Sequence, residues 1–352
     1  MSDVLGNNLK LVIFGESHGP LIGATISGLP SGIKIDESFI SSQLEKRKAN
    51  DSLSTSRQED DEYQIVSGVY NGYTTGTALT ILIENKKQHS QDYKEVVYRP
   101  GHADYTGSLR YNSFNDHRGG GHFSGRLTAP IVAVCSIIIS YLKEQGIEIG
   151  SRIKEIHGIE DDEITNINET ITKFNNEIFP AISEVKKELM KKEIEKARDN
   201  LDSVGGVIET YVNGLKGGIG NPFFDSLESV IAHALFSIPG VKGVEFGLGF
   251  DFKDKYGSEV SDSLRFNEGK VTTSTNNNGG INGGISNGMP IIIRSVIKPT
   301  PSIGREQKSI NAQLENIDLE IKGRHDPCIV RRARVVIDSL VAFSILDSML
   351  SR

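Results

Sequence analysis

Cysteine is scarce in this chain of 352 residues, and tryptophan is absent. Cys135 lies in an apolar, helix-like run and Cys328 in a polar motif, so we expect two reduced thiols and no disulfide framework. Histidine and cysteine never fall at zinc-ligand spacings, which argues against a dedicated metal site. We therefore expect the fold to be stabilised by packing, without disulfides or a structural metal.

Long apolar runs are also lacking. The longest, residues 131–139, is much shorter than the roughly 20 residues that cross a bilayer, so we expect no transmembrane helix. The N-terminus has no basic region followed by an apolar run, which predicts no secretory signal and a cytoplasmic location.

Basic residues do not exceed acidic ones: 39 Lys and Arg stand against 46 Asp and Glu, for a net charge of -7. This balance predicts no general attraction to nucleic acid or to an anionic membrane. Common nucleotide signatures fail as well, because the only Gly-Lys pair precedes Val271 instead of Ser or Thr, and G-x-G-x-x-G does not occur. An anionic ligand must therefore be bound locally, by another arrangement.

Glycine is abundant, with 37 residues, whereas average usage predicts about 25 in this length. It clusters beside apolar runs at residues 68–76, 119–125, 205–220 and 279–288. Glycine admits positive φ and a close approach of the backbone to a ligand, which favours tight turns around a binding cavity. Bulges and hairpins in a large sheet are the alternative interpretation.

Hydrophobic periodicity predicts a mixed α and β protein. Strands are expected at residues 9–14, 77–83, 204–212, 244–250 and 290–297. Helices are expected at residues 36–48, 127–142, 182–198, 224–236 and 333–350. The polar stretch around 160–199 lacks glycine but keeps apolar anchors, so we interpret residues 1–352 as a single domain that carries a polar helical insertion there.

Two histidines stand in segments that also hold Gly, Arg and Asp. His18 directly follows the first expected strand, where a loop projects side chains into a cleft, and its near-neutral pKa suits proton transfer. His102 lies between Arg99 and Asp104, so both neighbours tune its charge. A histidine satisfied by turn backbone and a surface ion-pair loop are the respective alternatives.

Arg118 and Arg126 bracket three consecutive glycines just before the helix expected from Leu127. Backbone N–H groups, the positive end of the helix dipole and two guanidinium groups could all face one phosphate there. A glycine-rich hairpin with solvated arginines is the alternative. Asp326 precedes Pro327, a pattern that predicts the N-cap of the last helix.

Taken together, these segments make the chain resemble the chorismate synthase family. The resemblance extends in order over nearly the whole chain and includes several motifs of five or more residues at compatible spacing. The matching segments are residues 14–19, 67–69, 74–77, 99–106, 118–129, 240–245, 279–290, 298–302 and 324–328.

The resemblance implies an anti-1,4-elimination of phosphate and the C6 hydrogen from 5-enolpyruvylshikimate 3-phosphate, giving chorismate for aromatic amino acid biosynthesis. It implies reduced FMN as a cofactor without net oxidation, and we expect NADPH at most as an indirect reductant. It also implies an α+β fold, a β-α-β sandwich with internally duplicated helix and antiparallel sheet layers, assembled as a homotetramer.

Residue by residue, the resemblance makes His18 the acid that protonates the departing phosphate and His102 the residue that stabilises or protonates reduced flavin. Ser17 and Asp326 match the family's relay near flavin N5. The positions that match substrate or phosphate ligands are Arg47, Arg118 and Arg126. The positions that match flavin contacts are His122, Phe123, Ser124, Gly283, Lys298, Pro299, Thr300, Pro301, Ser302 and Arg324.

The chain departs from the family pattern at three places. Residues 48–52 replace the usual Arg-Pro-Gly-Gln-Ser after Arg47, so the basic arm over the phosphate is expected to be weaker or differently built. His122-Phe123 replaces the frequent Arg-Ser, and Arg331 stands where the family usually has Pro. The path into the last helix is therefore expected to differ.

Two other functions fit the same residues less well. A non-catalytic scaffold that binds RNA or another polyanion conflicts with the acidic total and with the lack of aromatics among the basic clusters. A flavin oxidoreductase acting on another anionic substrate would keep the site but change its chemistry.

Overall fold

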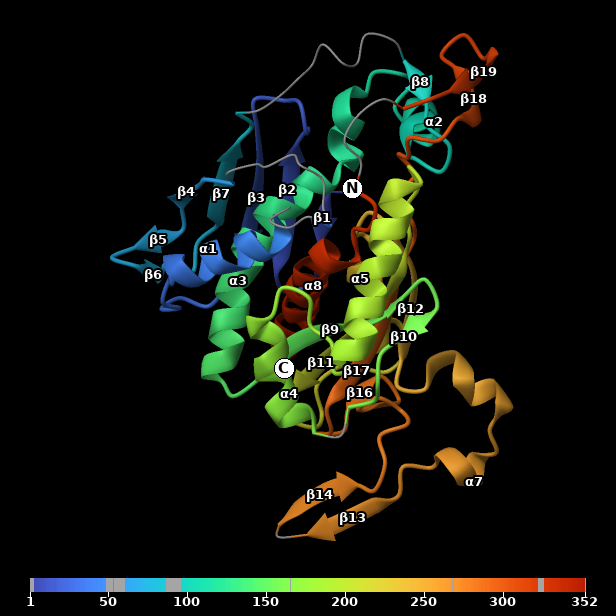
Figure 1. The fold of residues 1–352 in the computed structure, drawn as a ribbon. Coiled ribbons are helices and arrows are strands. Elements are labelled where there is room, and N and C mark those ends of the chain that lie inside the picture. Colours follow the sequence, from blue (N-terminus) through green and yellow to red (C-terminus); the bar gives the residue numbers. More distant parts are fainter. Residues whose placement is uncertain are drawn as a thin grey trace.

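Two five-stranded antiparallel sheets enclose a layer of helices in the computed structural model, which describes residues 3–48, 53, 61–86, 96–164, 166–267, 269–321 and 326–351 (Figure 1). The first sheet has the order β1 (Val4–Leu5), β2 (Lys10–Gly15), β3 (Leu21–Ser27), β7 (Leu79–Glu84), β4 (Tyr63–Ser67). The second has the order β10 (Ile159–Glu160), β9 (Glu148–Ile156), β11 (Gly206–Asn213), β17 (Ile291–Ile297), β12 (Val241–Phe246).

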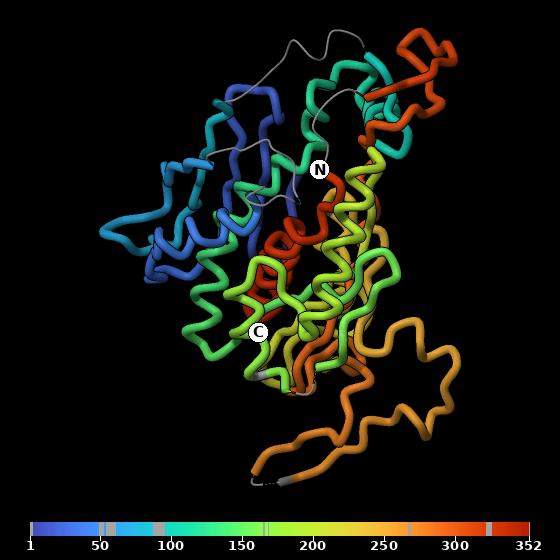
Figure 2. Tube along the Cα trace, in the orientation of Figure 1, coloured from blue at the N-terminus to red at the C-terminus, as the bar shows by residue number. Residues whose placement is uncertain are grey.

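Four helices form the layer between the sheets, and the C-terminal helix lies at its centre (Figure 2). They are α1 (Glu37–Arg47), α3 (Thr128–Glu144), α6 (Leu227–Phe236) and α8 (Val330–Met349). Helix α8 packs against each of the other three, and it is buried along nearly its whole length. Its buried charged residues have partners: Arg334 donates to the carbonyls of Ser151, Phe174 and Glu177, and Asp338 accepts from Ser151 Oγ.

Alternation along the strands decides which face of each sheet meets the helices. On β7, Leu79, Ile81 and Ile83 are at most 1% exposed, whereas the residues between them are only half-buried. On β17, Ile291 and Ile293 point inward in the same way. Because side chains alternate with a period of two, each sheet turns one apolar face to the shared core.

The two halves of the chain share one topology. Along the sequence the first half runs β2, β3, α1, β4, β7, α3, and its sheet places these strands in the order β2-β3-β7-β4. The second half runs β9, β11, α6, β12, β17, α8, with the order β9-β11-β17-β12. Each α-helix follows the same strand in its half, so the expected internally duplicated β-α-β sandwich is confirmed.

Smaller sheets and helices are attached to this sandwich. A three-stranded sheet combines β8 (Val97–Tyr98), β18 (Gln307–Asn311) and β19 (Asn316–Leu319). Two-stranded hairpins are β5 (Val69–Tyr70) with β6 (Tyr73–Thr74), β13 (Leu264–Asn267) with β14 (Lys270–Thr273), and β15 (Ile281–Asn282) with β16 (Ile285–Ser286). The remaining helices are α2 (Asp104–Arg110), α4 (Ile167–Asn176), α5 (Glu184–Asp199) and α7 (Gly257–Val260), with 3-10 turns at Arg118–Phe123, Gly125–Leu127, Phe223–Asp225 and Gly249–Asp254.

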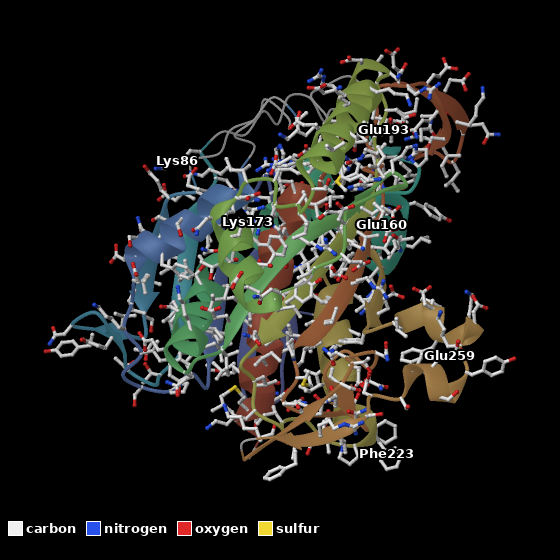
Figure 3. The ribbon with its side chains drawn as sticks, turned by 60° about the horizontal axis from the view of Figure 1, so that its bottom comes forward. Lys86, Glu160, Lys173, Glu193, Phe223 and Glu259 are labelled. Carbon is white, nitrogen blue, oxygen red and sulfur yellow. The ribbon has the colours of Figure 1, made fainter. Side chains whose placement is uncertain are left out.

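The segment that the sequence marked as a polar insertion forms α4, which packs against Tyr211 of β11, and α5, whose Met190 and Ile194 join the main core. Asp161 fastens it: its carboxylate accepts backbone N–H groups of Ile182 at 2.7 Å and Ser183 at 3.0 Å. The same carboxylate binds the fully buried Arg152 of β9 at 2.9 Å. Charged residues such as Lys173 and Glu193 lie on these two helices (Figure 3).

The expected helices are present, but their ends differ in one informative place. Asp36 caps α1 as its position predicts, accepting Phe39 N–H at 2.9 Å. The prediction that Asp326 caps the last helix is wrong, because α8 begins at Val330 and Asp326 instead binds Arg332. The strand expected at 244–250 also lies earlier, at Val241–Phe246, and a 3-10 turn follows it.

One stretch among the described residues, Gly125–Glu144, is long and apolar enough by length and composition to cross a bilayer. It comprises α3 and the 3-10 turn before it, and 78% of its apolar window is buried inside the molecule. Packing against α1 and α8 accounts for this apolar character, as expected of a core helix.

Candidate active site

The predicted site residues gather where the two repeats make equivalent connections. The connection from β7 to α3 carries His102 and the glycine run, and the connection from β17 to α8 carries residues 298–302 and Asp326. Strand β8 of the first connection pairs with β18 of the second. Duplication therefore brings together two segments about 200 positions apart in sequence.

Direct contacts join the two connections. Arg99 donates from Nη1 to Ser302 Oγ at 3.2 Å, and Lys298 donates from Nζ to the carbonyl of Gly101. A Cβ built on Gly101 would lie 3.6 Å from the Pro301 ring. The expected flavin segment thus lies directly against the loop of His102.

Ser17 and His18 lie in the turn between β2 and β3, and each is only 4% exposed. Ser17 Oγ is 3.1 Å from His18 Nδ1 and donates to the carbonyl of Arg118 at 3.1 Å. Since a hydroxyl has one proton to donate, Oγ accepts from Nδ1–H of His18. This leaves Nε2 as the nitrogen of His18 that gains or loses a proton.

The glycine run packs against both histidines. Gly119, Gly120 and Gly121 have φ of 59°, 89° and 53°, a region that L side chains avoid. A Cβ on Gly119 would lie 2.2 Å from His18 Cε1, and one on Gly120 would lie 3.4 Å from His102 Nε2. His18 and His102 therefore flank the same short backbone segment, and only glycine permits this approach.

His102 belongs to a buried ionic group with Arg99 and Asp104. Its Nδ1 is 2.7 Å from Asp104, and Arg99 donates to the same carboxylate from Nε at 2.7 Å. Burial opposes ionisation of Asp104, but the hydrogen bonds from Arg99 and His102 outweigh it and hold the pKa of Asp104 well below its usual value. His102 Nδ1 lies between Asp104 and Arg99, whose Nη2 is 3.1 Å away, and Nε2 lies on the side of Gly120.

Arg47 and Arg126 meet through a carboxylate that the sequence analysis missed. Asp61, whose side chain is fully buried, binds Arg47 Nη2 at 2.6 Å with one oxygen and Arg126 with the other. Burial opposes its ionisation, but the two guanidinium groups outweigh it and hold the pKa of Asp61 below its ordinary value. The group carries a net charge of one positive unit, and no spacing rule could have linked residues of three separate elements.

Arg118 is also paired, though at the surface. It donates to Asp116 from Nε at 2.9 Å and from Nη2 at 2.8 Å, and its side chain is 39% exposed. The sequence analysis counted arginines as anion ligands and overlooked these acidic partners. The net positive charge of the site is consequently smaller than a count of its basic residues suggests.

Asp326 enters the site from the second connection. Its carboxylate binds Arg332 of α8, whose Nε donates to the carbonyl of Arg47 at 2.7 Å. Its own carbonyl accepts from Thr300 Oγ1 at 2.8 Å. Ser17 and Asp326 therefore contact different elements: Ser17 binds the glycine run, and Asp326 binds α8.

Arg331 explains the unusual entry into the last helix. Its side chain is buried and donates from Nη2 to the carbonyl of Lys48 at 3.0 Å, just after α1 ends. A proline there could not make this bond. The departure from the family pattern thus ties α8 to the C-terminal end of α1.

The other expected flavin residues divide into groups. His122 donates from Nδ1 to Gly15 O at 2.9 Å, and Phe123 packs against Gly107 and Tyr111 of the α2 region. Ser124 caps the next turn by accepting Arg126 N–H at 3.3 Å. The side chains of His122, Phe123 and Ser124 therefore make contacts within the protein that stabilise this loop.

Gly283 lies apart from these residues, exposed in the turn of the β15–β16 hairpin, well away from β8 and α2 in Figure 1. Arg324 lies outside the described residues, as do most of the positions after Arg47 that depart from the family pattern.

A pocket of about 450 Å³ opens beside His102. Arg99, Gly101, Tyr105 and Thr106 line it together with residues of β18 and β19. Its volume lies within the range of about 300–1,000 Å³ that is usual for small-molecule sites. Within the part of the chain that the structure describes, no cluster of His, Cys, Asp and Glu is arranged to hold a metal ion.

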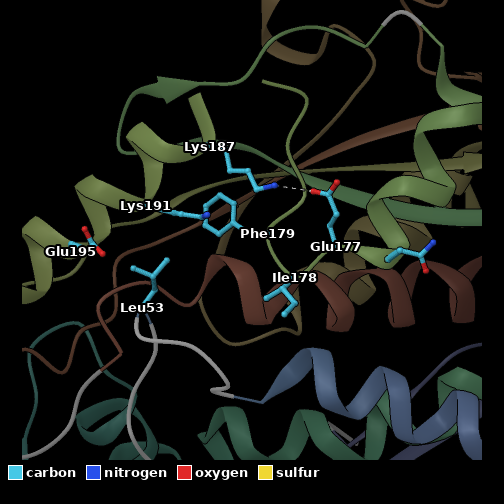
Figure 4. A pocket seen from close by; sticks show the side chains of 8 residues that line it. Leu53, Glu177, Ile178, Phe179, Lys187, Lys191 and Glu195 are labelled. Atoms are coloured by element: carbon cyan, nitrogen blue, oxygen red, sulfur yellow. Dashed lines mark hydrogen bonds and ion pairs between the residues drawn. The ribbon is translucent and has the colours of Figure 1, made fainter. Parts of the chain in front are cut away.

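A second pocket, of about 520 Å³, lies beside the insertion and contains none of the predicted residues (Figure 4). Lys187 and Glu177 bond there at 3.2 Å, and Lys191 lies 5.9 Å from the centre of the Phe179 ring. Its polar groups pair with one another, unlike the convergent groups around His102.

Comparison with known proteins gives one consistent result. A sequence model of the chorismate synthase family matches residues 9–350. Chorismate synthase of Pyrococcus abyssi is 44% identical over 350 residues, covering 99% of this chain and 97% of that protein. Chorismate synthase of Lachnoclostridium phytofermentans is also 44% identical over 350 residues, covering 98% and 94%.

A solved crystal structure of chorismate synthase is 29% identical, covers 98% of this chain and 93% of that chain, and superposes with a TM-score of 0.77. The fold, the order of the motifs and the similarity over the full length agree. The chain belongs to the chorismate synthase family, lyases of the shikimate pathway.

Proposed function

We propose that this chain eliminates phosphate and the C6 hydrogen from 5-enolpyruvylshikimate 3-phosphate to form chorismate, with reduced FMN and no net redox change. The observation that carries the proposal is that His18 and His102 flank one glycine segment, Gly119–Gly120. Two proton-carrying groups beside one glycine segment suit a reaction in which one leaving group and one cofactor each need a proton.

The residues present fit a reduced flavin mononucleotide. Arg99 and His102 line the pocket, and Lys298 and Ser302 supply an ammonium and a hydroxyl group beside the same loop. Arg99, His102 and Lys298 would hold the flavin. When bound, reduced flavin supplies electron density to the substrate as phosphate leaves.

His18 acts as the general acid. Ser17 keeps the Nδ1 proton in place, so the protonated Nε2 donates to the oxygen of the departing phosphate. Burial of the imidazole in the turn restricts its rotation and excludes water from the transfer. His102, held by Asp104 and Arg99, stabilises negative charge next to Gly120.

Arg126, Arg47 and Arg118 bind the substrate's phosphate and carboxylates. Each already has a carboxylate partner, so a substrate anion must share or replace Asp61 or Asp116. The net positive charge around Asp61 attracts a polyanion, while the paired carboxylates keep the guanidinium groups fixed before the substrate arrives. Ser17 and Asp326 remain our proposed relay near the flavin.

Further features of the protein follow from the same proposal. Reduced flavin comes from an external source, with NADPH as an indirect reductant, and the enzyme acts in the cytoplasm as a homotetramer of single-domain chains, without nucleic-acid or membrane partners. The alternative of a polyanion-binding scaffold has no support from the family to which the chain belongs.

Variants of the two histidines test the proposal. We expect His18→Ala and His102→Ala to fold and to bind flavin but to lose turnover, each raising the barrier by roughly 3 to 5 kcal/mol. The control is His157→Ala, because His157 is 61% exposed and lies on the insertion side of the second sheet. Chorismate and phosphate are followed under anaerobic conditions with chemically reduced FMN. Wild-type turnover in either active-site variant would remove that histidine from the mechanism.

A further inference from the structure

Asn85 follows β7 directly and lies against the turn that carries His18. Its Nδ2 donates to the carbonyl of Glu16 at 3.0 Å and to the carbonyl of Gly19 at 2.9 Å, the residues on either side of Ser17-His18. Its backbone N–H donates to the carbonyl of Pro20 at 3.1 Å. Three hydrogen bonds from one residue therefore fix the turn.

The other end of the Asn85 amide reaches the arginine group. Its Oδ1 accepts from Arg126 Nε at 3.2 Å, and Arg126 binds Asp61, the carboxylate shared with Arg47. A guanidinium can only donate and a carbonyl can only accept, so these partners fix the orientation of the amide. A carboxamide is the side-chain group that can serve both at once.

The second repeat supports a role in the site for this position. Asn85 is the first residue after β7, and Lys298 is the first residue after β17, the equivalent strand of the second half. Both donate from the backbone, to Pro20 and Gly240 respectively, and both side chains reach into a connection that carries site residues. Each repeat thus places a polar side chain directly after its equivalent strand, β7 or β17.

We propose that Asn85 is a positioning residue, which holds the turn of the acid His18 and the anion-binding Arg126 at a fixed separation. The proposal rests on the proposed function of those two residues. Asn85 acts through them and needs no contact with the reacting atoms. Displacement of a catalytic group by about 1 Å can cost on the order of 100-fold in rate, so the loss of the Asn85 hydrogen bonds should have a measurable effect.

Two variants separate the two ends of the amide. Asn85→Asp keeps an oxygen acceptor for Arg126 but loses the donors to Glu16 and Gly19. We expect its kcat to fall by about 10- to 100-fold, with KM for the substrate within about threefold of wild type. Asn85→Ala loses both ends, so we expect the same fall in kcat together with a KM raised by about tenfold.

The control is Asn175→Asp, which removes a similar amide-to-carbonyl bond, to Ile149 at 2.9 Å, from α4. We expect its kcat and KM to match wild type. Wild-type kcat in Asn85→Asp would overturn the proposal. The proposal would also be overturned if the two Asn85 variants changed kcat and KM by the same factors and both changes followed a lowered melting temperature. Lost stability would then account for the effect. Absence of turnover in the wild-type protein would instead overturn the proposed function.

Discussion

At the scale of single residues, the site depends on how closely backbone and side chains approach. The glycine run could be recognised from sequence, and so could His18 and His102 as proton carriers. The two carboxylates that bind basic residues of the site, Asp61 and Asp104, differ in this respect. Asp104 is a near neighbour of His102 and was found from the motif, whereas Asp61 reaches Arg47 and Arg126 only through the tertiary fold.

Gly119 offers the most direct test of this packing. A Cβ there would lie 2.2 Å from His18 Cε1, and the φ of 59° disfavours any L side chain. We expect Gly119→Ala to lower the free energy of unfolding by about 1–3 kcal/mol and to displace His18, so that turnover falls. Denaturant unfolding and the anaerobic assay measure both effects.

Gly125 provides the matched control, since it lies in the same loop with nothing within 4 Å of a built Cβ. Gly125→Ala should keep wild-type stability and turnover. Equal behaviour of the two variants would show that the approach of Gly119 to His18 is not required.

Asp61 predicts a particular dependence of stability on pH. Its pKa is lowered in the folded protein, so the stabilisation is complete above the ordinary value of 3.8 and is lost as pH falls through the folded pKa. At neutral pH, Asp61→Asn leaves two buried guanidinium groups without their shared anion, which we expect to cost about 3–5 kcal/mol.

The difference in unfolding free energy between Asp61→Asn and wild type should therefore narrow below about pH 4, where wild type loses the same interaction. Denaturant unfolding at neutral and acidic pH measures it, with Asp251→Asn on an exposed 3-10 turn as control. A difference that stays constant with pH would contradict the assigned role of Asp61.

At the scale of elements, the duplicated frame decides where the site lies. Helix positions could be predicted because their apolar residues recur at helical spacing, and α1 even has its expected cap at Asp36. The pairing of β8 with β18 could not be predicted, since two-residue contacts between distant connections leave no periodic pattern. The cap role of Asp326 was mispredicted because an Asp-Pro pair resembles an N-cap, whereas α8 has Ile329 there and the carboxylate of Asp326 binds a guanidinium group.

The insertion gives a prediction at this scale. Asp161 joins the backbone before α5 to the buried Arg152, so Asp161→Ala removes one of the carboxylates that bind Arg152, which keeps Glu209 at 2.8 Å, and releases the start of α5. We expect a loss of about 1.5–3 kcal/mol in stability and faster hydrogen exchange of the α5 amides. Glu188→Ala, which changes an exposed pair with Lys191 on the same helix, should leave exchange unchanged. Unchanged exchange in Asp161→Ala would contradict this anchoring role.

At the scale of the whole molecule, the acidic total hides a local positive site. A count of charges indicated that an anion must be bound locally, but it could not show that Arg47 and Arg126 share Asp61 or that Arg118 pairs with Asp116. Large apolar side chains remain exposed on projecting loops, some of them visible near the lower margin of Figure 3. Among them are Phe223, Phe224, Phe250, Tyr256 and Phe266, each more than 70% exposed.

Such a set exceeds what scattered exposure on a monomer requires, and it supports the proposed homotetramer. We expect sedimentation equilibrium to give a mass four times the 38.5 kDa of one chain. We also expect Phe266→Asp, at a side chain 72% exposed on the β13–β14 hairpin, to weaken association without unfolding the chain. A monomer at all concentrations would contradict the proposed assembly.

The central claim is that the site eliminates phosphate while reduced flavin is neither consumed nor oxidised. The most direct measurement is anaerobic turnover with chemically reduced FMN far below the substrate concentration and no other reductant. The account predicts that all 5-enolpyruvylshikimate 3-phosphate is converted, with chorismate and phosphate in equal amounts and the flavin still reduced at the end. A reaction that stops after one substrate per flavin, with the flavin oxidised, would contradict it and assign the site to an oxidoreductase.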